Sequence, residues 1–137
     1  MINKIQTTWK GGMLFESTNP GGNLAINDGG ESADVAYTPK ALMLASLAGC
    51  SGLDIASLVK KMRVEIDDFN IDVEGELTDE HPKYYHKVAM TYHFYGSNLD
   101  QKKLQKIVDL SVEKYCGVMA MFEKFADVKV NIAYHAK

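Results

Sequence analysis

The sequence predicts an α+β fold, because strand-like and helix-like patterns alternate along its 137 residues without a repeat. One observation is the uncharged, apolar segment from Ala41 to Leu53, which is typical of a buried helix. Another is the alternation of apolar and polar residues over 69–77, 88–94 and 128–134, which predicts strands with one solvated face. Together these patterns favour sheets packed on central helices.

The N-terminal 37 residues predict a small antiparallel meander. Short strands are expected over 4–9, 13–16 and 24–26. The turn between the first two contains Gly11-Gly12, and the segment 19–23, with Pro and two glycines, is a strong signal for the second turn.

A long helix is predicted to follow, over 39–62. Thr38 is a suitable N-cap, and Pro39 suits the first helical position, where its missing N–H is not needed. Apolar residues recur every three or four positions, and the residues between them are also apolar in the first half, so we expect this helix to be enclosed on every side. A few short strands cannot supply that cover, which favours an intertwined homodimer with a shared core.

The remaining elements are two strands, two helices and a last strand. The strands 69–77 and 88–94 are expected to pair as a hairpin. Apolar residues from Leu104 to Tyr115 mark one face of a second long helix, a short helix is expected over 118–125, and 128–134 is the final strand. The expected architecture is therefore antiparallel sheets packed on long central helices, in a single domain over residues 1–137.

Composition narrows the functional classes. The net charge of −3 and the single arginine argue against nucleic acid as a partner. The longest uncharged run has 13 residues, against the roughly 20 that a membrane-spanning helix needs, so no membrane segment is expected. The N-terminus shows no secretory signal, which favours a reducing cytoplasm, where the two cysteines would rest as thiols.

The two cysteines, Cys50 and Cys116, are the candidate functional residues. They lie 66 positions apart on two predicted core helices and match neither a CxxC motif nor a zinc-ligand spacing. If the fold brings them together, they can act as an attacking and a resolving thiol. The spacing alone favours two buried structural cysteines, because free cysteine is among the most buried residue types.

Other residues add less to the site. An attacking thiolate needs a nearby cation, and none flanks Cys50 in the sequence, so Lys10, Lys40 and Arg63 are the candidates. The histidines show no metal-ligand spacing, and no nucleotide-binding or hydrolase motif is present, so neither a metal nor an organic cofactor is expected. The histidines are His81, His86, His93 and His135.

Two segments resemble a known family. Residues 38–50, TPKALMLASLAGC, look like the first-cysteine helix of the OsmC/Ohr family, and residues 113–118, EKYCGV, look like its second-cysteine turn. The resemblance implies an intertwined homodimer in which Cys50 attacks an organic hydroperoxide and becomes a sulfenic acid. It also implies that Cys116 condenses with Cys50 to a disulfide, which a dithiol reductant reopens, without a metal or an organic cofactor.

The chain departs from the active peroxidases of this family at two places. Residues 1–37 contain no arginine to hold the thiolate, and Lys40-Ala41 stands where those enzymes carry a glutamate. The chain is thus closer to the OsmC-like branch than to the hydroperoxide resistance branch. Lys10 is our candidate thiolate partner and Lys40 the second, and the alternative function is a non-catalytic dimer that senses redox state or binds a small apolar ligand.

Overall fold

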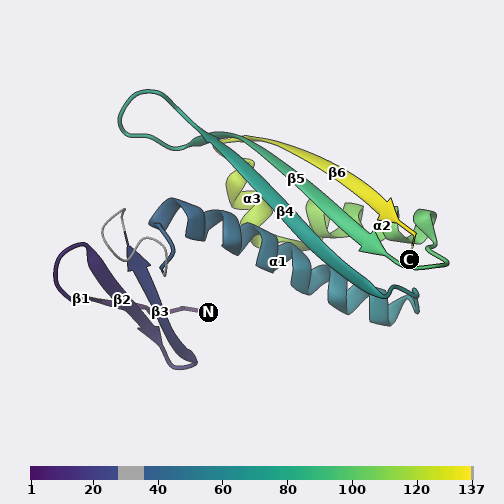
Figure 1. The fold of residues 1–137 in the computed structure, drawn as a ribbon, viewed down its shortest axis with the longest axis horizontal. Coiled ribbons are helices and arrows are strands. Elements are labelled where there is room, and N and C mark those ends of the chain that lie inside the picture. The colour runs from purple at the N-terminus through teal and green to yellow at the C-terminus, as the bar shows by residue number, and fades with distance from the viewer. Residues whose placement is uncertain (28–35, 137) are drawn as a thin grey trace. The chain divides into compact units, whose positions relative to one another are not determined.

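The computed structural model describes residues 1–27 and 36–136 (Figure 1). The chain divides into two compact units, Met1–Met43 and Leu44–Lys137, and each unit contains one three-stranded sheet. The α+β class is confirmed. A single domain over residues 1–137 stays a prediction.

The sheet of the first unit is the predicted meander. It consists of β1 (Gln6–Trp9), β2 (Leu14–Asn19) and β3 (Gly22–Asn27), which pair antiparallel in that order. Gly11 and Gly12 form the first turn with φ of 101° and 54°, which residues with a side chain rarely adopt. The turn signals therefore located both hairpins correctly, although β2 and β3 are longer than predicted.

The long helix α1 runs from Pro39 to Lys61, close to the predicted bounds. The Ala41 amide donates a hydrogen bond to the Thr38 side-chain oxygen over 3.3 Å, so Thr38 is the N-cap. The helix ends before Arg63, whose φ of 55° is left-handed.

The prediction that α1 is enclosed on every side is wrong for the single chain. Its buried residues are Leu47, Ser51 and Ile55, whereas Leu53 is 75% exposed. By length and composition alone this helix could also cross a membrane, since an 18-residue window has a mean hydropathy of 1.7. That is weak evidence, because core helices of soluble proteins pass the same test, and α1 does contribute to a core.

The sheet of the second unit contains β4 (Asp68–Leu77), β5 (Tyr85–Tyr95) and β6 (Asp127–His135), in that order. The β4–β5 hairpin is antiparallel, as predicted, but β6 pairs parallel to β5, which corrects the expectation of antiparallel sheets. The reason is the helical segment between β5 and β6, which returns the chain to the start of β5, so that β6 runs in the same direction.

That helical segment has three parts. The helix α2 (Gln101–Leu110) continues into a π-helix, η1 (Ser111–Tyr115), and α3 (Gly117–Phe122) follows. The sequence predicted ordinary helix up to Tyr115 and missed the π turn, in which the Cys116 amide donates to the Ser111 carbonyl over 2.8 Å. Ser111 and Cys116 are thereby held in one turn.

All three α-helices of the second unit contribute to one core with the sheet. Alternate residues of β5 are buried, which is the pattern of a strand with one face against helices. The residues at the centre of this core include Leu47 and Ile55 of α1, Met90, Tyr92 and Phe94 of β5, Leu104, Ile107 and Val108 of α2, and Met119 and Phe122 of α3.

Candidate functional site

The two cysteines lie together in the second unit. Cys50, in the middle of α1, is half-buried and packs against the core, whereas Cys116, between η1 and α3, is only 4% exposed. Both are free thiols, and a hydrogen bond joins their side chains. The fold therefore brings together two residues that are far apart in the sequence.

The surroundings of Cys116 disfavour its thiolate. Burial is the main reason that its pKa is raised to about 11. The Met119 amide, which donates to the Cys116 sulfur over 3.3 Å, lowers the pKa, while the hydrogen bond to Cys50 and the charges of Cys50 and Asp54 raise it. Burial and these contacts together favour the protonated thiol at Cys116.

A chain of buried hydroxyl groups lies beside the thiols. The Ser51 hydroxyl is 2.6 Å from the Tyr92 hydroxyl and 2.7 Å from the Ser111 hydroxyl, and Ser111 donates to a carboxylate oxygen of Asp54 over 2.9 Å. Tyr92, Ser51 and Ser111 are all 0% exposed, and Asp54 is half-buried. We call Tyr92, Ser51, Ser111 and Asp54 the hydroxyl chain.

The elements that carry the cysteines also position the hydroxyl chain. Ser51 follows Cys50 on α1, and Asp54 is one turn further along that helix. The Ser111 carbonyl accepts the hydrogen bond of the Cys116 amide, so the same turn places both residues. Tyr92 points into the core from β5.

Sequence reasoning missed the hydroxyl chain as a functional feature. A signal was nevertheless present, because Ser51 and Asp54 share the helical spacing of the apolar face at Leu47, and Ser111 lies on the apolar face of the next helix. Polar residues at buried positions need partners, and here they are partners of one another. In the described residues, no buried side-chain nitrogen or oxygen lacks a hydrogen bond.

Tyr92 is also affected by the charges of Cys116 and Asp54. Burial is the main reason that the Tyr92 pKa is raised. The hydrogen bond to Ser51 lowers this pKa, and the charges of Cys116 and Asp54 raise it. The charge of Asp54 therefore disfavours the ionisation of both Tyr92 and Cys116.

The candidate cations lie in different parts of the chain. Lys10, exposed, follows β1 in the first unit, and Lys40 is exposed in the first turn of α1. Arg63 lies beyond the end of α1, and the segment from Cys50 to Lys61 alone spans about 16 Å along the helix axis. The structure thus separates Arg63 from Cys50, and the pairing of Lys10 with Cys50 stays a prediction.

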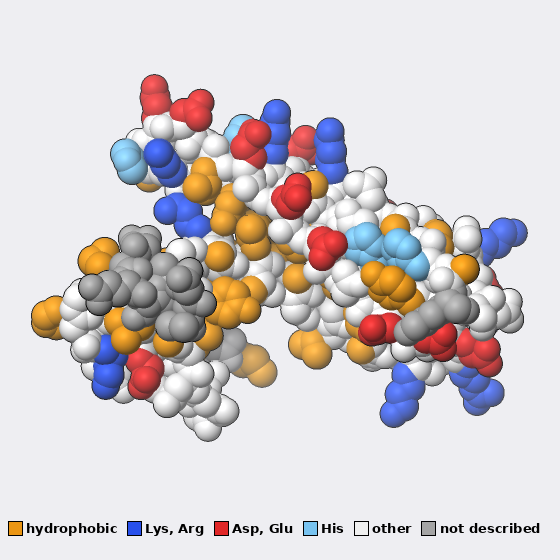
Figure 2. All heavy atoms as spheres, viewed as in Figure 1, with side chains coloured by type: hydrophobic (Ala, Val, Ile, Leu, Met, Phe, Trp, Pro, Cys, Tyr) orange, Lys and Arg blue, Asp and Glu red, His pale blue; other side chains and the backbone are white. Residues whose placement is uncertain are grey.

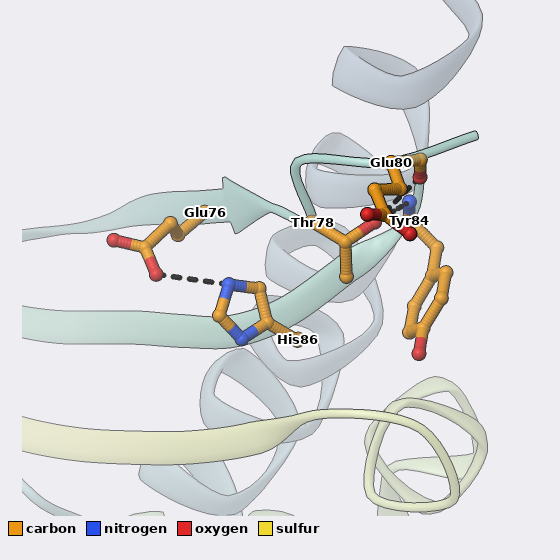
Figure 3. Close-up of polar contacts among 5 residues, drawn as sticks. All are labelled: Glu76, Thr78, Glu80, Tyr84 and His86. Carbon is orange, nitrogen blue, oxygen red and sulfur yellow. Dashed lines mark hydrogen bonds and ion pairs between the residues drawn. The ribbon is translucent and has the colours of Figure 1, made fainter. Parts of the chain in front are cut away.

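Two of the four histidines, His86 and His93, contact carboxylates on the neighbouring strand. The His86 ring is 2.9 Å from Glu76 at one end of the β4–β5 hairpin (Figure 3). The His93 ring is 3.0 Å from Asp72 and 2.9 Å from His135. Figure 2 shows histidine side chains side by side on the surface, next to acidic ones. Among residues 1–27 and 36–136, no group of three or more His, Cys, Asp or Glu is arranged to hold a metal ion.

A groove of about 410 Å³ lies on the second unit's sheet, away from the thiols. Charged side chains of both signs line it, and neither cysteine does. Its lining residues are Glu74, Gly75, Glu76, Lys87, Val88, Ala89, Asp127 and Lys129. The groove is therefore separate from the dithiol site.

The site thus consists of a half-buried free thiol hydrogen-bonded to a buried free thiol, on an α+β scaffold. The chain belongs to the OsmC-like protein family, whose model matches residues 29–131.

Several known proteins are similar to this chain along nearly its whole length. Protein YhfA of Escherichia coli K12 is 30% identical over 125 residues, which cover 91% of this chain and 92% of that protein. The crystal structure of a hypothetical protein from Aquifex aeolicus VF5 matches with a TM-score of 0.89 and 28% identity, covering 100% of this chain and 98% of that one. An organic hydroperoxide resistance protein OsmC from Legionella pneumophila matches with a TM-score of 0.71 and 21% identity, covering 97% of each chain.

Proposed function

We propose that this protein is a thiol peroxidase that reduces organic hydroperoxides in the cytoplasm, in defence against oxidative stress. The observation that carries the proposal is the asymmetric thiol pair, with Cys50 half-buried and Cys116 buried and hydrogen-bonded to it. A partly exposed thiol can meet a substrate, and a buried neighbour is protected from the substrate but within reach of the first sulfur.

The proposed reaction has three steps. The Cys50 thiolate attacks the terminal oxygen of the hydroperoxide, the O–O bond breaks, and the alcohol leaves with one proton while Cys50 becomes a sulfenic acid. The Cys116 sulfur then attacks the sulfenic sulfur, forming the disulfide and releasing water. A dithiol reductant restores both thiols by exchange and leaves as its own disulfide.

The apolar surroundings of Cys50 support a bulky organic substrate over hydrogen peroxide. Cys50 packs against the hydrophobic core, and an apolar substituent on the peroxide gains from leaving water there. The name of the Legionella relative, organic hydroperoxide resistance protein, agrees with this substrate class.

A thiol count before and after one equivalent of cumene hydroperoxide tests the function. We expect two thiols per chain to fall to none, with a Cys50–Cys116 disulfide identified by mass spectrometry. If the count stays at two, the protein is not a peroxidase, and the alternative of a non-catalytic dimer that binds a small apolar ligand gains support. Disulfide formation that a dithiol reverses, but without sustained peroxide consumption in excess dithiol, favours a redox sensor.

We further propose that two copies form an intertwined homodimer through α1. The observation behind this is the exposed apolar surface of the helix, with Leu53 75% exposed. Light scattering at micromolar concentration should give about twice the chain mass of 15.2 kDa. Leu53→Asp should shift the mass toward one chain, because a buried charge opposes association. A wild-type mass of one chain contradicts the dimer.

Lys10 is our proposed cation for the Cys50 thiolate. Lys10→Met should slow the oxidation of Cys50 by hydroperoxide about tenfold, because an opposite charge stabilises a thiolate. Lys4→Met is the matched control, since Lys4 is also an exposed N-terminal lysine, and it should leave the rate unchanged. Stopped-flow measurement of sulfenic acid formation compares the two, and equal rates would remove Lys10 from the mechanism.

A further inference from the structure

A hydrogen bond between two buried serines links the elements that carry the cysteines. Ser51 directly follows Cys50 on α1. Ser111 opens the π turn that ends at Cys116. The two serine hydroxyl oxygens are 2.7 Å apart, and both residues are 0% exposed. Because the Ser111 carbonyl accepts the hydrogen bond of the Cys116 amide over 2.8 Å, two short hydrogen bonds lead from the residue after Cys50 to the backbone of Cys116.

The Ser111 side chain has a second attachment to α1. Its hydroxyl donates to a carboxylate oxygen of Asp54 over 2.9 Å. A serine hydroxyl has only one hydrogen to donate, so Ser51 is the donor in the bond between the two serines. Residues three apart lie on one face of a helix, so Ser51 and Asp54 hold the Ser111 hydroxyl from two neighbouring points of α1. Two directional bonds fix the orientation of the π turn against α1 as well as its distance.

The backbone of Ser111 connects the same residue to α2 and to the second cysteine. Its amide donates to the carbonyls of Ile107 and Val108 in the last turn of α2, and its carbonyl accepts from the Cys116 amide. A π turn contains one residue more than an α turn, is rare, and occurs mostly as a single turn at functional sites. Ser111 is therefore the residue through which α1 contacts the turn that places Cys116.

Close packing by itself does not require polar groups at these positions. Replacing two buried hydrogen-bonded groups by apolar groups of the same shape can be nearly neutral for stability. Hydrogen bonds differ from apolar contacts because they are directional, and a fully satisfied buried network favours one arrangement of the elements over others. In the part of the chain that the structure describes, every buried side-chain nitrogen and oxygen is hydrogen-bonded, so this network meets that condition.

We propose that Ser51, Ser111 and Asp54 form a clamp, which holds the turn before the second cysteine against α1 and so keeps the two sulfurs within reach of each other. This inference rests on the proposed reaction, in which oxidised Cys50 has to meet the Cys116 sulfur. A thiol held beside its partner acts at a much higher effective concentration than a free thiol. The three residues of the clamp act by positioning and take no part in the bond changes.

The reduction potential of the Cys50–Cys116 disulfide measures the clamp without a peroxide. In a series of glutathione and dithiothreitol buffers, the two thiols give up two electrons and two protons to the buffer disulfide, which becomes two thiols. Alkylation of the thiols that remain on the protein gives the equilibrium. Ser111→Ala should lower the effective concentration of the two thiols about tenfold, which for this two-electron couple raises the potential by about 30 mV. Ser51→Ala should shift the potential in the same direction.

Two substitutions of Asp54 separate the clamp from the effect of the Asp54 charge. In Asp54→Asn the side-chain carbonyl still accepts the hydrogen bond from Ser111, whereas in Asp54→Leu a side chain of similar size cannot. Both variants lose the charge. We expect Asp54→Asn to keep the wild-type potential and Asp54→Leu to shift it as Ser111→Ala does. Equal potentials in the two variants would overturn the clamp.

Val88→Ala is the control for a general loss of stability. Val88 is buried on β5 and belongs to the same core, but its side chain makes none of these hydrogen bonds. Its truncation should lower the midpoint of urea unfolding and leave the potential unchanged. A wild-type potential in Ser111→Ala, an equal shift in Val88→Ala, or no disulfide in any buffer overturns the clamp. Failure of hydroperoxide to oxidise Cys50 refutes the peroxidase but leaves these potentials intact.

Discussion

Cys50→Ser is expected to abolish hydroperoxide reduction, leaving only the rate seen without protein. The serine hydroxyl is nearly isosteric with the thiol, but it is a poor nucleophile at neutral pH because it stays protonated. Because Cys50 is half-buried in α1, the substitution should leave the fold intact, which circular dichroism verifies. The measurement is peroxide consumption with excess dithiol reductant.

Cys116→Ser distinguishes the roles of the two thiols in the same assay. Without the resolving thiol, Cys50 should consume one equivalent of hydroperoxide and stop as a sulfenic acid that a trapping reagent labels. Sustained turnover in this variant would show that the reductant attacks Cys50 directly, and residual turnover in Cys50→Ser would place the chemistry elsewhere in the molecule.

Phe94→Ala should destabilise the protein by about 3–5 kcal/mol, the usual cost of truncating a buried phenylalanine. Phe94 is fully buried on β5, and its ring stacks against Phe69 and Tyr134 at centroid distances of 6.1 and 6.3 Å. Truncation therefore leaves a cavity beside the side chains of Phe69 on β4 and Tyr134 on β6. With a slope of about 1–3 kcal/mol per M, the midpoint of urea unfolding should fall by about 2 M.

Tyr84→Ala is the matched control for core truncation. Tyr84 also carries a large aromatic ring, but its side chain is half exposed, next to the β4–β5 loop (Figure 3). Its removal should change the stability by no more than about 0.5 kcal/mol. Equal losses in the two variants would mean that Phe94 does not hold the core as described.

Local patterns in the sequence predicted most of the fold. Thr38 and Pro39 indicated the start of α1, the glycines indicated the turns of the first sheet, and period-two alternation indicated the strands. These features depend on neighbouring residues, so a single sequence carries them. The direction of β6 and the π turn before Cys116 depend on how the helical crossover packs, and no local pattern records that.

For the site, the sequence by itself determined which residues can do thiol chemistry, because Cys50 and Cys116 are its only cysteines and their flanking segments resemble those of one family. Only the tertiary structure decided their roles. Burial and the hydrogen bond between the thiols set Cys116 apart from Cys50, and both arise from contacts between α1 and the turn after η1. The hydroxyl chain joins α1, β5 and η1, so it exists only after these three elements have packed together.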